Sequence, residues 1–433
     1  MPQKEQPTLP RVLNRFDLTA IAVNTIIGSG IFVMPAAAAA SVGAWAPLSF
    51  LACAFIILTL VLTYAAAASR FSETGGPYLY AKKAFGSFAG FEVGWIFWLG
   101  RISAVGANYS VFMLYLGYFA PQLSQGLPRA AIITVLAVLI TLANIRGIKL
   151  SSQIVNAFTI SKLLPLGLLI LAGLFFLDFE KSGAAKDFTS ADFLRSIFIL
   201  VFAYGGFEQA SIPGGESKNP KHDLPRALLL AIGIVTLVYV SMQFVVYNLD
   251  PTIAESKRPL AQVAEMIIGP LGAGLIALGA IVSTCGYVFG ASLAVPRLTF
   301  ALAEQEQLPP ILTRLHPRFR TPWFSILFHF FITWTLAILL SFLQLAVINV
   351  MARLVVSVVT CLAVMRFQKT DQAPSAFRLP GRQLIPLAGI GLATLLLFQA
   401  SPNELIYGTL ALAIGAVIYF IFSRAANFSK IIE

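Results

Sequence analysis

Apolar runs of about 20 residues recur along the whole chain, and they constrain its fold more than any other feature. A helix of about that length crosses a hydrocarbon core of roughly 30 Å. Only 11% of the 433 residues are charged, whereas a soluble domain of this size carries roughly a quarter. The sequence therefore predicts an all-α polytopic membrane protein and excludes a soluble fold.

Hydropathy predicts twelve transmembrane helices. They fall at residues 16–38, 45–69, 86–119, 129–147, 152–177, 193–214, 225–248, 270–302, 323–342, 344–366, 384–401 and 404–423. The longest loops, 178–192 and 249–269, are too short to hold a soluble domain. We therefore expect a single membrane domain over residues 1–433.

Lys and Arg residues are distributed unevenly between alternate loops. With the N-terminus in the cytoplasm, the cytoplasmic segments hold 21 of them and the outer loops hold six. Cytoplasmic loops of membrane proteins carry the excess of positive charge. We therefore expect a multi-pass protein of the cytoplasmic membrane with both termini in the cytoplasm. The polar, proline-containing first 17 residues lack signal-peptide features, so the first span is expected to remain in the mature protein.

The net charge of +11 does not indicate a nucleic-acid partner, because the basic residues form small clusters between apolar runs. Cys53, Cys285 and Cys361 lie within predicted spans and lack metal-ligand spacing. The sequence shows no His/Asp cluster and no phosphate-binding loop. We therefore expect no nucleic-acid partner, no metal, no cofactor and no enzymatic activity.

Glycines interrupt two predicted spans near mid-depth. Gly28-Ser29-Gly30 lies in the first span, and Gly205-Gly206 lies in the sixth. Glycine adopts backbone angles that are closed to other residues, so a helix can unwind locally there. The two spans start five helices apart, so they enter the membrane from opposite sides. Paired interruptions of this kind indicate a transporter built from an inverted repeat.

The interruptions divide the chain into two five-helix repeats, residues 16–177 and 193–366, with residues 384–423 as two appended helices. In an alternative interpretation, the glycines only allow helices to pack closely. The matching position of the second cluster in the second half of the chain favours the repeat.

Unwinding gives each interruption a binding chemistry. Amides at the start of the second half of span 1 lie where the helix dipole favours negative charge, so they suit a carboxylate. Carbonyls freed in span 6 suit an ammonium group, and such bare backbone is tolerated only where it lines a cavity or packs on protein. The residues expected to bind the substrate carboxylate and ammonium groups are Ile27, Gly28, Ser29, Gly30, Ile31, Phe202, Ala203, Tyr204 and Gly205.

The motifs "IIGSGIF", "FAYGGFE" and "ESKNPKHDLPRAL" closely resemble the amino acid–polyamine–organocation superfamily of permeases. The resemblance runs from about Phe16 to Phe422 and includes "ALAEQEQLPP" and "FRLPGRQLIPLAGI". It implies the LeuT-type fold and transport of amino acids or related amines by alternating access. In that family the GSG amides take the substrate carboxylate, the broken sixth span takes the amine, and many members place an aromatic gate at the position of Phe202.

Lys162 lies about ten residues into the fifth predicted span. A buried ammonium without an anion partner gives up its proton more readily than an exposed one. Several members of the resembled family have a lysine here, where sodium-coupled relatives bind a cation, which implies proton coupling or sodium-independent exchange. We expect its amine to approach the first interruption near Ile26–Gly28, and Ser283 and Thr284 of the eighth span. The alternative is a permanently charged structural lysine.

Two more ionisable side chains are predicted at membrane depth. The resemblance implies proton-linked gating for Glu208, and the alternative is a structural carboxylate in the inner half of span 6. Arg101 keeps its charge in proteins and so requires an anion or several carbonyls. Glu208 is one candidate partner for Arg101, and a substrate side chain is another. Arg353, in span 10, is expected to pack against carbonyls.

The resemblance and the motifs together imply a secondary transporter of amino acids, proton-coupled and independent of sodium. Neutral or hydrophobic amino acids are favoured, because the side-chain pocket looks apolar apart from Asn108, Tyr287 and Ser283. The alternatives are a sodium-independent exchanger of amino acids or amines and an amino acid-sensing receptor. A channel is disfavoured because no continuous polar stripe is visible. The expected partners are the substrate, the proton and the lipid bilayer. No accessory subunit is expected.

Overall fold

The computed structural model describes residues 14–71, 75–147, 152–177, 187–210, 220–370 and 377–432, and within them every long element is a helix. The α-helices are α1 (Arg15–Ile26), α2 (Gly30–Val42), α3 (Ala46–Ala68), α4 (Gly76–Phe85), α5 (Ser87–Phe119), α6 (Gly126–Ile145), α7 (Ser152–Phe175), α8 (Ser190–Leu200), α9 (Phe207–Ala210), α10 (Pro220–Leu249), α11 (Pro259–Ile268), α12 (Pro270–Glu304), α13 (Trp323–Leu339), α14 (Phe342–Thr370), α15 (Leu384–Leu397) and α16 (Pro402–Ile432). Short 3-10 helices occupy Gly43–Trp45, Pro121–Leu123, Pro251–Glu255 and Pro310–Thr313.

Within the described part of the chain, eight stretches are long and apolar enough to cross a membrane. They are Gly30–Ala68, Ser87–Phe119, Gly126–Ile145, Phe158–Phe175, His222–Leu249, Pro270–Glu304, Phe342–Thr370 and Pro402–Ser423. Three further apolar helices, α11, α13 and α15, are shorter. The all-α membrane class predicted from the sequence is confirmed.

Both predicted interruptions are present. The first predicted span is divided into α1 and α2, and the sixth is divided into α8 and α9 by a turn over residues 201–206. Most other boundaries agree to a few residues; α10, for instance, begins at Pro220 rather than at residue 225, whereas α16 continues to Ile432, beyond the predicted end at residue 423. Residues 211–219, which include the first four residues of the third motif, lie outside the described residues.

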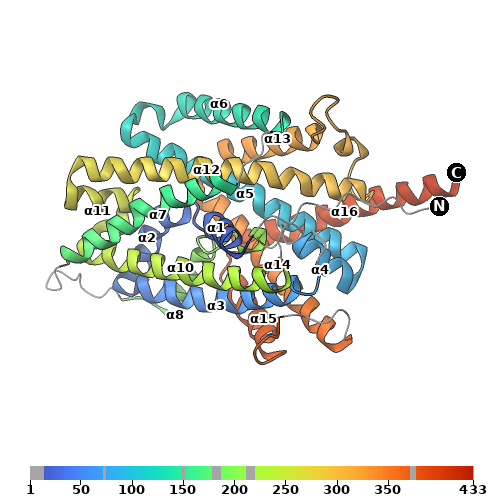
Figure 1. Cartoon of the computed structure of the whole chain (residues 1–433), viewed down its shortest axis with the longest axis horizontal. Helices are drawn as coiled ribbons and strands as arrows, with labels where there is room; N and C mark the ends of the chain where they lie inside the picture. The colour runs from blue at the N-terminus through green and yellow to red at the C-terminus, as the bar shows by residue number, and fades with distance from the viewer. Residues whose placement is uncertain are drawn as a thin grey trace.

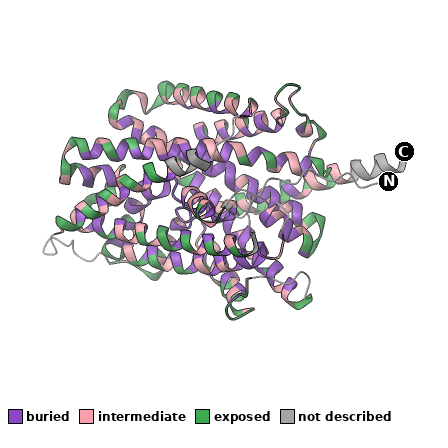
Figure 2. Cartoon of the chain, viewed as in Figure 1, coloured by how far each residue is buried: buried purple, intermediate pink, exposed green. Residues whose placement is uncertain are grey.

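The long helices α3, α10 and α12 run along the long axis of the molecule, and α1 lies near the centre (Figure 1). Helix α5 packs against α12 and α14, and α10 packs against α3 and α1. The buried residues concentrate where these helices face one another (Figure 2). The interrupted segments therefore lie inside the bundle, where other helices can satisfy their backbone groups.

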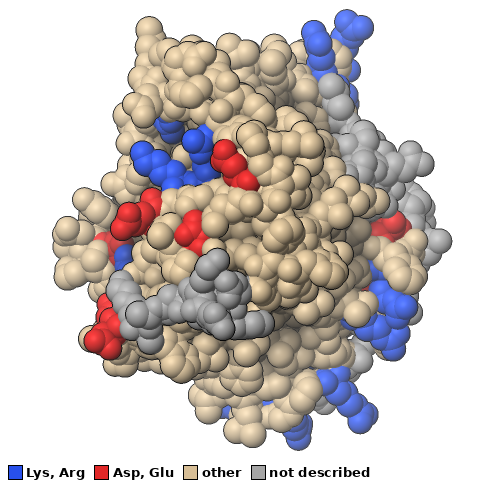
Figure 3. All heavy atoms as spheres, turned by 90° about the vertical axis from the view of Figure 1, so that its left-hand side faces the viewer, with Lys and Arg blue, Asp and Glu red and all other residues tan. Residues whose placement is uncertain are grey.

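The outer helix α6 shows why this bundle belongs in lipid. Its buried residues, Ile133, Ala137, Ile140 and Asn144, recur at helical spacing and form one stripe. The opposite face exposes large apolar side chains, among them Leu139. An apolar outer face like that of α6 is stable against hydrocarbon and unfavourable in water. The end of the bundle, seen in Figure 3, carries small groups of both positive and negative side chains.

Candidate functional site

The first interruption forms because α1 stops at Ile26 and the chain leaves helical geometry at Ile27, whose ψ is 86°. The Gly28 amide donates a hydrogen bond to the Ile26 carbonyl (2.9 Å), which closes a tight turn. Helix α2 then begins at Gly30, and its first amides have no acceptor in their own helix. In the described part of the chain, the Gly30 and Ile31 amides have no backbone acceptor. This is the arrangement of donors that the sequence predicted.

The second interruption is a turn between α8 and α9. Gly206 has a φ of 122°, a conformation that favours glycine. Several of the freed carbonyls already accept hydrogen bonds: Val201 from Arg353, Phe202 from the Gly205 amide and Ala203 from a tyrosine hydroxyl. The carbonyls of Tyr204 and Gly205 accept none from the described residues. The predicted set of ammonium acceptors is therefore narrowed to this pair.

The two interruptions pack directly on each other. A Cβ on Gly30 would lie 2.7 Å from Ala203 Cα, and one on Gly206 would overlap the Thr25 carbonyl. The hydroxyl of Tyr239, on α10, lies 3.1 Å from the Ala203 carbonyl and 3.4 Å from the Ile26 carbonyl, so it bridges both segments. The glycines therefore do both things that the sequence suggested: they allow the helices to pack closely, and they leave the first amides of α2 without backbone acceptors.

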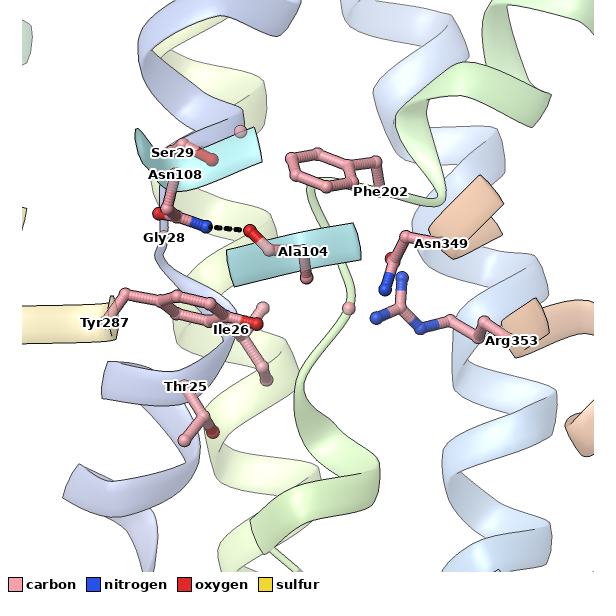
Figure 4. A pocket seen from close by; sticks show the side chains of 12 residues that line it. Thr25, Ile26, Gly28, Ser29, Ala104, Asn108, Phe202, Tyr287, Asn349 and Arg353 are labelled. Carbon is pink, nitrogen blue, oxygen red and sulfur yellow. Dashed lines mark hydrogen bonds between the residues drawn. The ribbon is translucent and has the colours of Figure 1, made fainter. Parts of the chain in front are cut away.

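A cavity of about 10 Å³, room for roughly one water molecule, lies between the interruptions. Figure 4 shows Asn349 and Arg353 reaching from α14 toward the segment that carries Phe202, with Tyr287 on the opposite side. The lining residues are Thr25, Ile26, Gly28, Ser29, Gly30, Ala104, Asn108, Phe202, Gly205, Tyr287, Asn349 and Arg353. An amino acid is much larger than this cavity, so binding one requires lining residues to move apart.

The cavity brings together seven of the predicted site residues: Gly28, Ser29, Gly30, Asn108, Phe202, Gly205 and Tyr287. The other nine do not line it: Ile27, Ile31, Arg101, Lys162, Ala203, Tyr204, Glu208, Ser283 and Thr284. Among the latter, Ile27 and Ile31 have fully buried side chains. The five other lining residues were not predicted to line the site: Thr25, Ile26, Ala104, Asn349 and Arg353.

Lys162 lies behind the first interruption and is completely buried. Its ammonium donates to the carbonyls of Ile27 (2.8 Å) and Asn24 (3.1 Å), at the negative end of α1. The predicted approach to the first interruption is thus present. The Thr284 hydroxyl donates to its own helix, and the Ser283 hydroxyl has no partner among the described residues. The hydrogen bonds of Lys162 go to the carbonyls of α1 and of the interruption rather than to the eighth predicted span.

Glu208 and Arg353 form a buried ion pair beside the second interruption. Glu208 Oε2 also accepts from the Gly206 amide (2.9 Å), and Arg353 Nη1 donates to the Val201 carbonyl (2.9 Å). The expected contact of Arg353 with a carbonyl is present, but its pairing with Glu208 was not predicted. Periodicity gives no information about which helix of the second half packs against residues 201–206.

Arg101 has a different partner from the one proposed. Its Nη2 donates to the Tyr287 hydroxyl, and its Nε and Nη1 have no partner among the described residues. Glu208, the candidate partner, makes its salt bridge with Arg353 instead. Arg101 is therefore a buried cation whose charge no described salt bridge offsets.

Three buried oxygens of the cavity lining have no hydrogen-bond partner among the described residues: Ser29 Oγ, Asn108 Oδ1 and Asn349 Oδ1. The amide nitrogens of the two asparagines are engaged, with the carbonyls of Ala104 (2.8 Å) and Gly100 (2.6 Å). Buried polar atoms without partners are costly unless a ligand or water satisfies them. They make the cavity a candidate binding site.

The fold and the cavity define a multi-pass helical membrane transporter. The family model described as "Amino acid permease" matches residues 13–423, and the chain belongs to this family. The chain is 35% identical to the serine/threonine exchanger SteT of Bacillus subtilis over 326 residues, which are 72% of this chain and 73% of that protein.

Two other relatives have different names. Identity is 27% to the branched-chain amino acid permease BcaP of Bacillus subtilis, covering 97% of this chain and 94% of that protein. It is 32% to an arginine/ornithine antiporter of Pseudomonas aeruginosa, covering 69% of this chain and 64% of that protein. The names of these three relatives therefore include neutral and cationic amino acids.

Gly30→Ala is expected to destabilise the protein and weaken substrate binding, because the new Cβ meets the Ala203 backbone. Overpacking of this kind costs about 1–3 kcal/mol. Thermal unfolding of the purified protein with and without ligand measures both effects. Gly290→Ala is the matched control, since a Cβ there meets nothing within 4 Å. Equal stability and binding in both variants would contradict the close packing described here.

Tyr239→Phe removes the hydroxyl that bridges the interruptions, and we expect slower transport from a folded protein. A lost hydrogen bond of this kind costs roughly 1 kcal/mol. Tyr247→Phe on the same helix is the control, because no hydrogen bond joins its hydroxyl to the described residues. Uptake into proteoliposomes is compared after equal reconstitution. An uptake rate in Tyr239→Phe equal to that of the control contradicts the bridging role.

Proposed function

We propose that this chain is a secondary active transporter that carries neutral amino acids across the cell membrane by alternating access. The observation that carries the proposal is the packing of two interrupted helices around one small cavity, with Gly30, the first residue of α2, in its lining. Two of the relatives are named for neutral amino acids, serine and threonine in one case and branched-chain amino acids in the other.

The proposal includes the finer architecture predicted from the sequence. Twelve helices form two inverted five-helix repeats of the LeuT type with two appended helices, and both termini lie in the cytoplasm. The chain works without an accessory subunit. The division of the first and sixth predicted spans supports this arrangement.

In the proposed substrate complex, the carboxylate binds the amides of Ser29, Gly30 and Ile31 at the positive end of α2. The ammonium group binds the carbonyls of Tyr204 and Gly205, which accept no hydrogen bond from the described residues. Phe202 packs edge-to-face on Phe342, with ring centroids 5.5 Å apart, and its ring lines the cavity. Rotation of this ring would admit or release the substrate.

Coupling is assigned to Lys162. Its ammonium binds the carbonyls at the end of α1, so its charge stabilises the docking of α1 on α7. Loss of the proton weakens that interaction, because a neutral amine no longer compensates the negative helix end. We propose that α1 is released from α7 in this state and that the transporter opens toward one side without sodium.

The first test is a thermal-shift screen of the twenty amino acids with the purified full chain. A ligand that binds only the folded state raises the unfolding temperature, increasingly so as its concentration exceeds its dissociation constant. We expect shifts with small or aliphatic neutral amino acids. A screen in which no amino acid produces a shift contradicts the proposed function, and binding without flux in vesicles indicates a sensing receptor.

The second test imposes a pH gradient on proteoliposomes without internal substrate. An inward proton gradient should drive net accumulation, and Lys162→Ala should abolish the effect of the gradient while substrate binding is retained. Lys257→Ala, an exposed lysine outside the site, serves as the control. Uptake that requires internal substrate and ignores the gradient overturns proton coupling. It supports a sodium-independent exchanger, the alternative that the similarity to the serine/threonine exchanger SteT favours.

A further inference from the structure

The cavity between the interruptions has a charged wall of one sign. Of its twelve lining residues, Arg353 is the one with a charged side chain, and no carboxylate is among them. A second guanidinium, that of Arg101, lies just outside the lining and donates to the lining Tyr287. A cationic substrate side chain entering this space would meet positive charge and no counterion within the lining.

The nearest described carboxylate, Glu208, is fully engaged. One of its oxygens pairs with Arg353 Nε and the other accepts from the Gly206 amide. Its exposed fraction is 2%, and it does not line the cavity. Arg353 does line the cavity, so the guanidinium stands between the carboxylate and the substrate space.

The position of the guanidinium is set by the second interruption. Its Nη1 donates to the Val201 carbonyl, and its atoms occupy the space where a Cβ on residue 205 would lie. Only glycine at position 205 leaves this space open. The backbone turn, the carbonyl and the carboxylate thus hold Arg353 in one place, and arginine keeps its charge at all physiological pH values.

We infer that Arg353 is a specificity-determining residue that excludes cationic amino acids by occupying Glu208, the carboxylate that would otherwise accept their side chains. Like charges a few ångströms apart repel strongly in a water-poor site. A cationic substrate side chain that finds no carboxylate to pair with is therefore rejected. The family includes a relative named for arginine and ornithine, so exclusion of cations is not a property of the family as a whole. This inference rests on the proposed function and names the substrates that the site rejects.

The experiment measures binding of lysine, ornithine and serine to the purified full chain by titration calorimetry. Arg353→Gln removes the ion-pair partner of Glu208, and we expect lysine and ornithine to bind at least tenfold more tightly than they bind the wild type. The double variant Arg353→Gln/Glu208→Gln removes the carboxylate and should lose that gain. Arg353→Lys keeps a cation at the position and should continue to reject lysine. A purely structural role for Arg353 would not produce a gain that depends on Glu208.

Several results would overturn the inference. One is a wild type that binds lysine within tenfold of its tightest neutral amino acid, which leaves the proposed function intact. Another is a folded Arg353→Gln without new affinity for lysine, or with a gain that persists in the double variant. If Arg353→Gln does not fold, the wild type and Arg353→Lys decide, since lysine binding by either contradicts exclusion. A wild type that binds no amino acid instead overturns the proposed function, and the inference with it.

Discussion

The direct packing of two interrupted helices on each other is the constraint on which the rest of the structure depends. Hydrocarbon offers no partner for a bare amide or carbonyl, so an interrupted span is stable only where protein supplies one. Here Gly30 rests on Ala203 and Gly206 rests on the Thr25 carbonyl, with Tyr239 bridging both segments. Any side chain at either glycine would separate the two segments and open unsatisfied backbone to the bundle.

Cations satisfy the freed carbonyls on each side. Lys162 of α7 donates to the carbonyls of Asn24 and Ile27, and Arg353 of α14 donates to that of Val201. In the proposed inverted repeat, α7 and α14 are the fifth helix of each half, so the same position in each half supports the interruption of that half. The two cations differ in chemistry. The lysine can release its proton, whereas the arginine cannot and forms an ion pair with Glu208.

This difference gives the two interruptions separate roles in the proposed mechanism. The first combines exposed amides with a support that can lose its charge, which suits binding coupled to protons. The second is held by a permanent ion pair, which suits a fixed wall that selects substrates by charge. The cavity between them, about 10 Å³, is too small for an amino acid, so the proposed transport requires other lining residues to move apart.

The sequence by itself determined the membrane class, the approximate helix boundaries and the positions of both interruptions. The length of apolar runs and the positions of glycine clusters are local features, so they can be recognised without knowledge of the fold. It also indicated seven of the lining residues, because they lie on or beside the interrupted segments or on one face of α5 or α12. The approach of Lys162 to the first interruption came from the resemblance to a family.

Only the tertiary structure decided which partners these residues meet. Glu208 forms its salt bridge with Arg353 rather than with Arg101. Asn349 lines the cavity and Tyr239 bridges the interruptions, although both are far from the first interruption in the sequence. Such pairings depend on the rotation and register of helices that are apolar on most faces, where periodicity distinguishes few alternatives. The sequence therefore predicted where the candidate site lies. The packing of α5, α10, α12 and α14 around it decided which charged and polar side chains meet there.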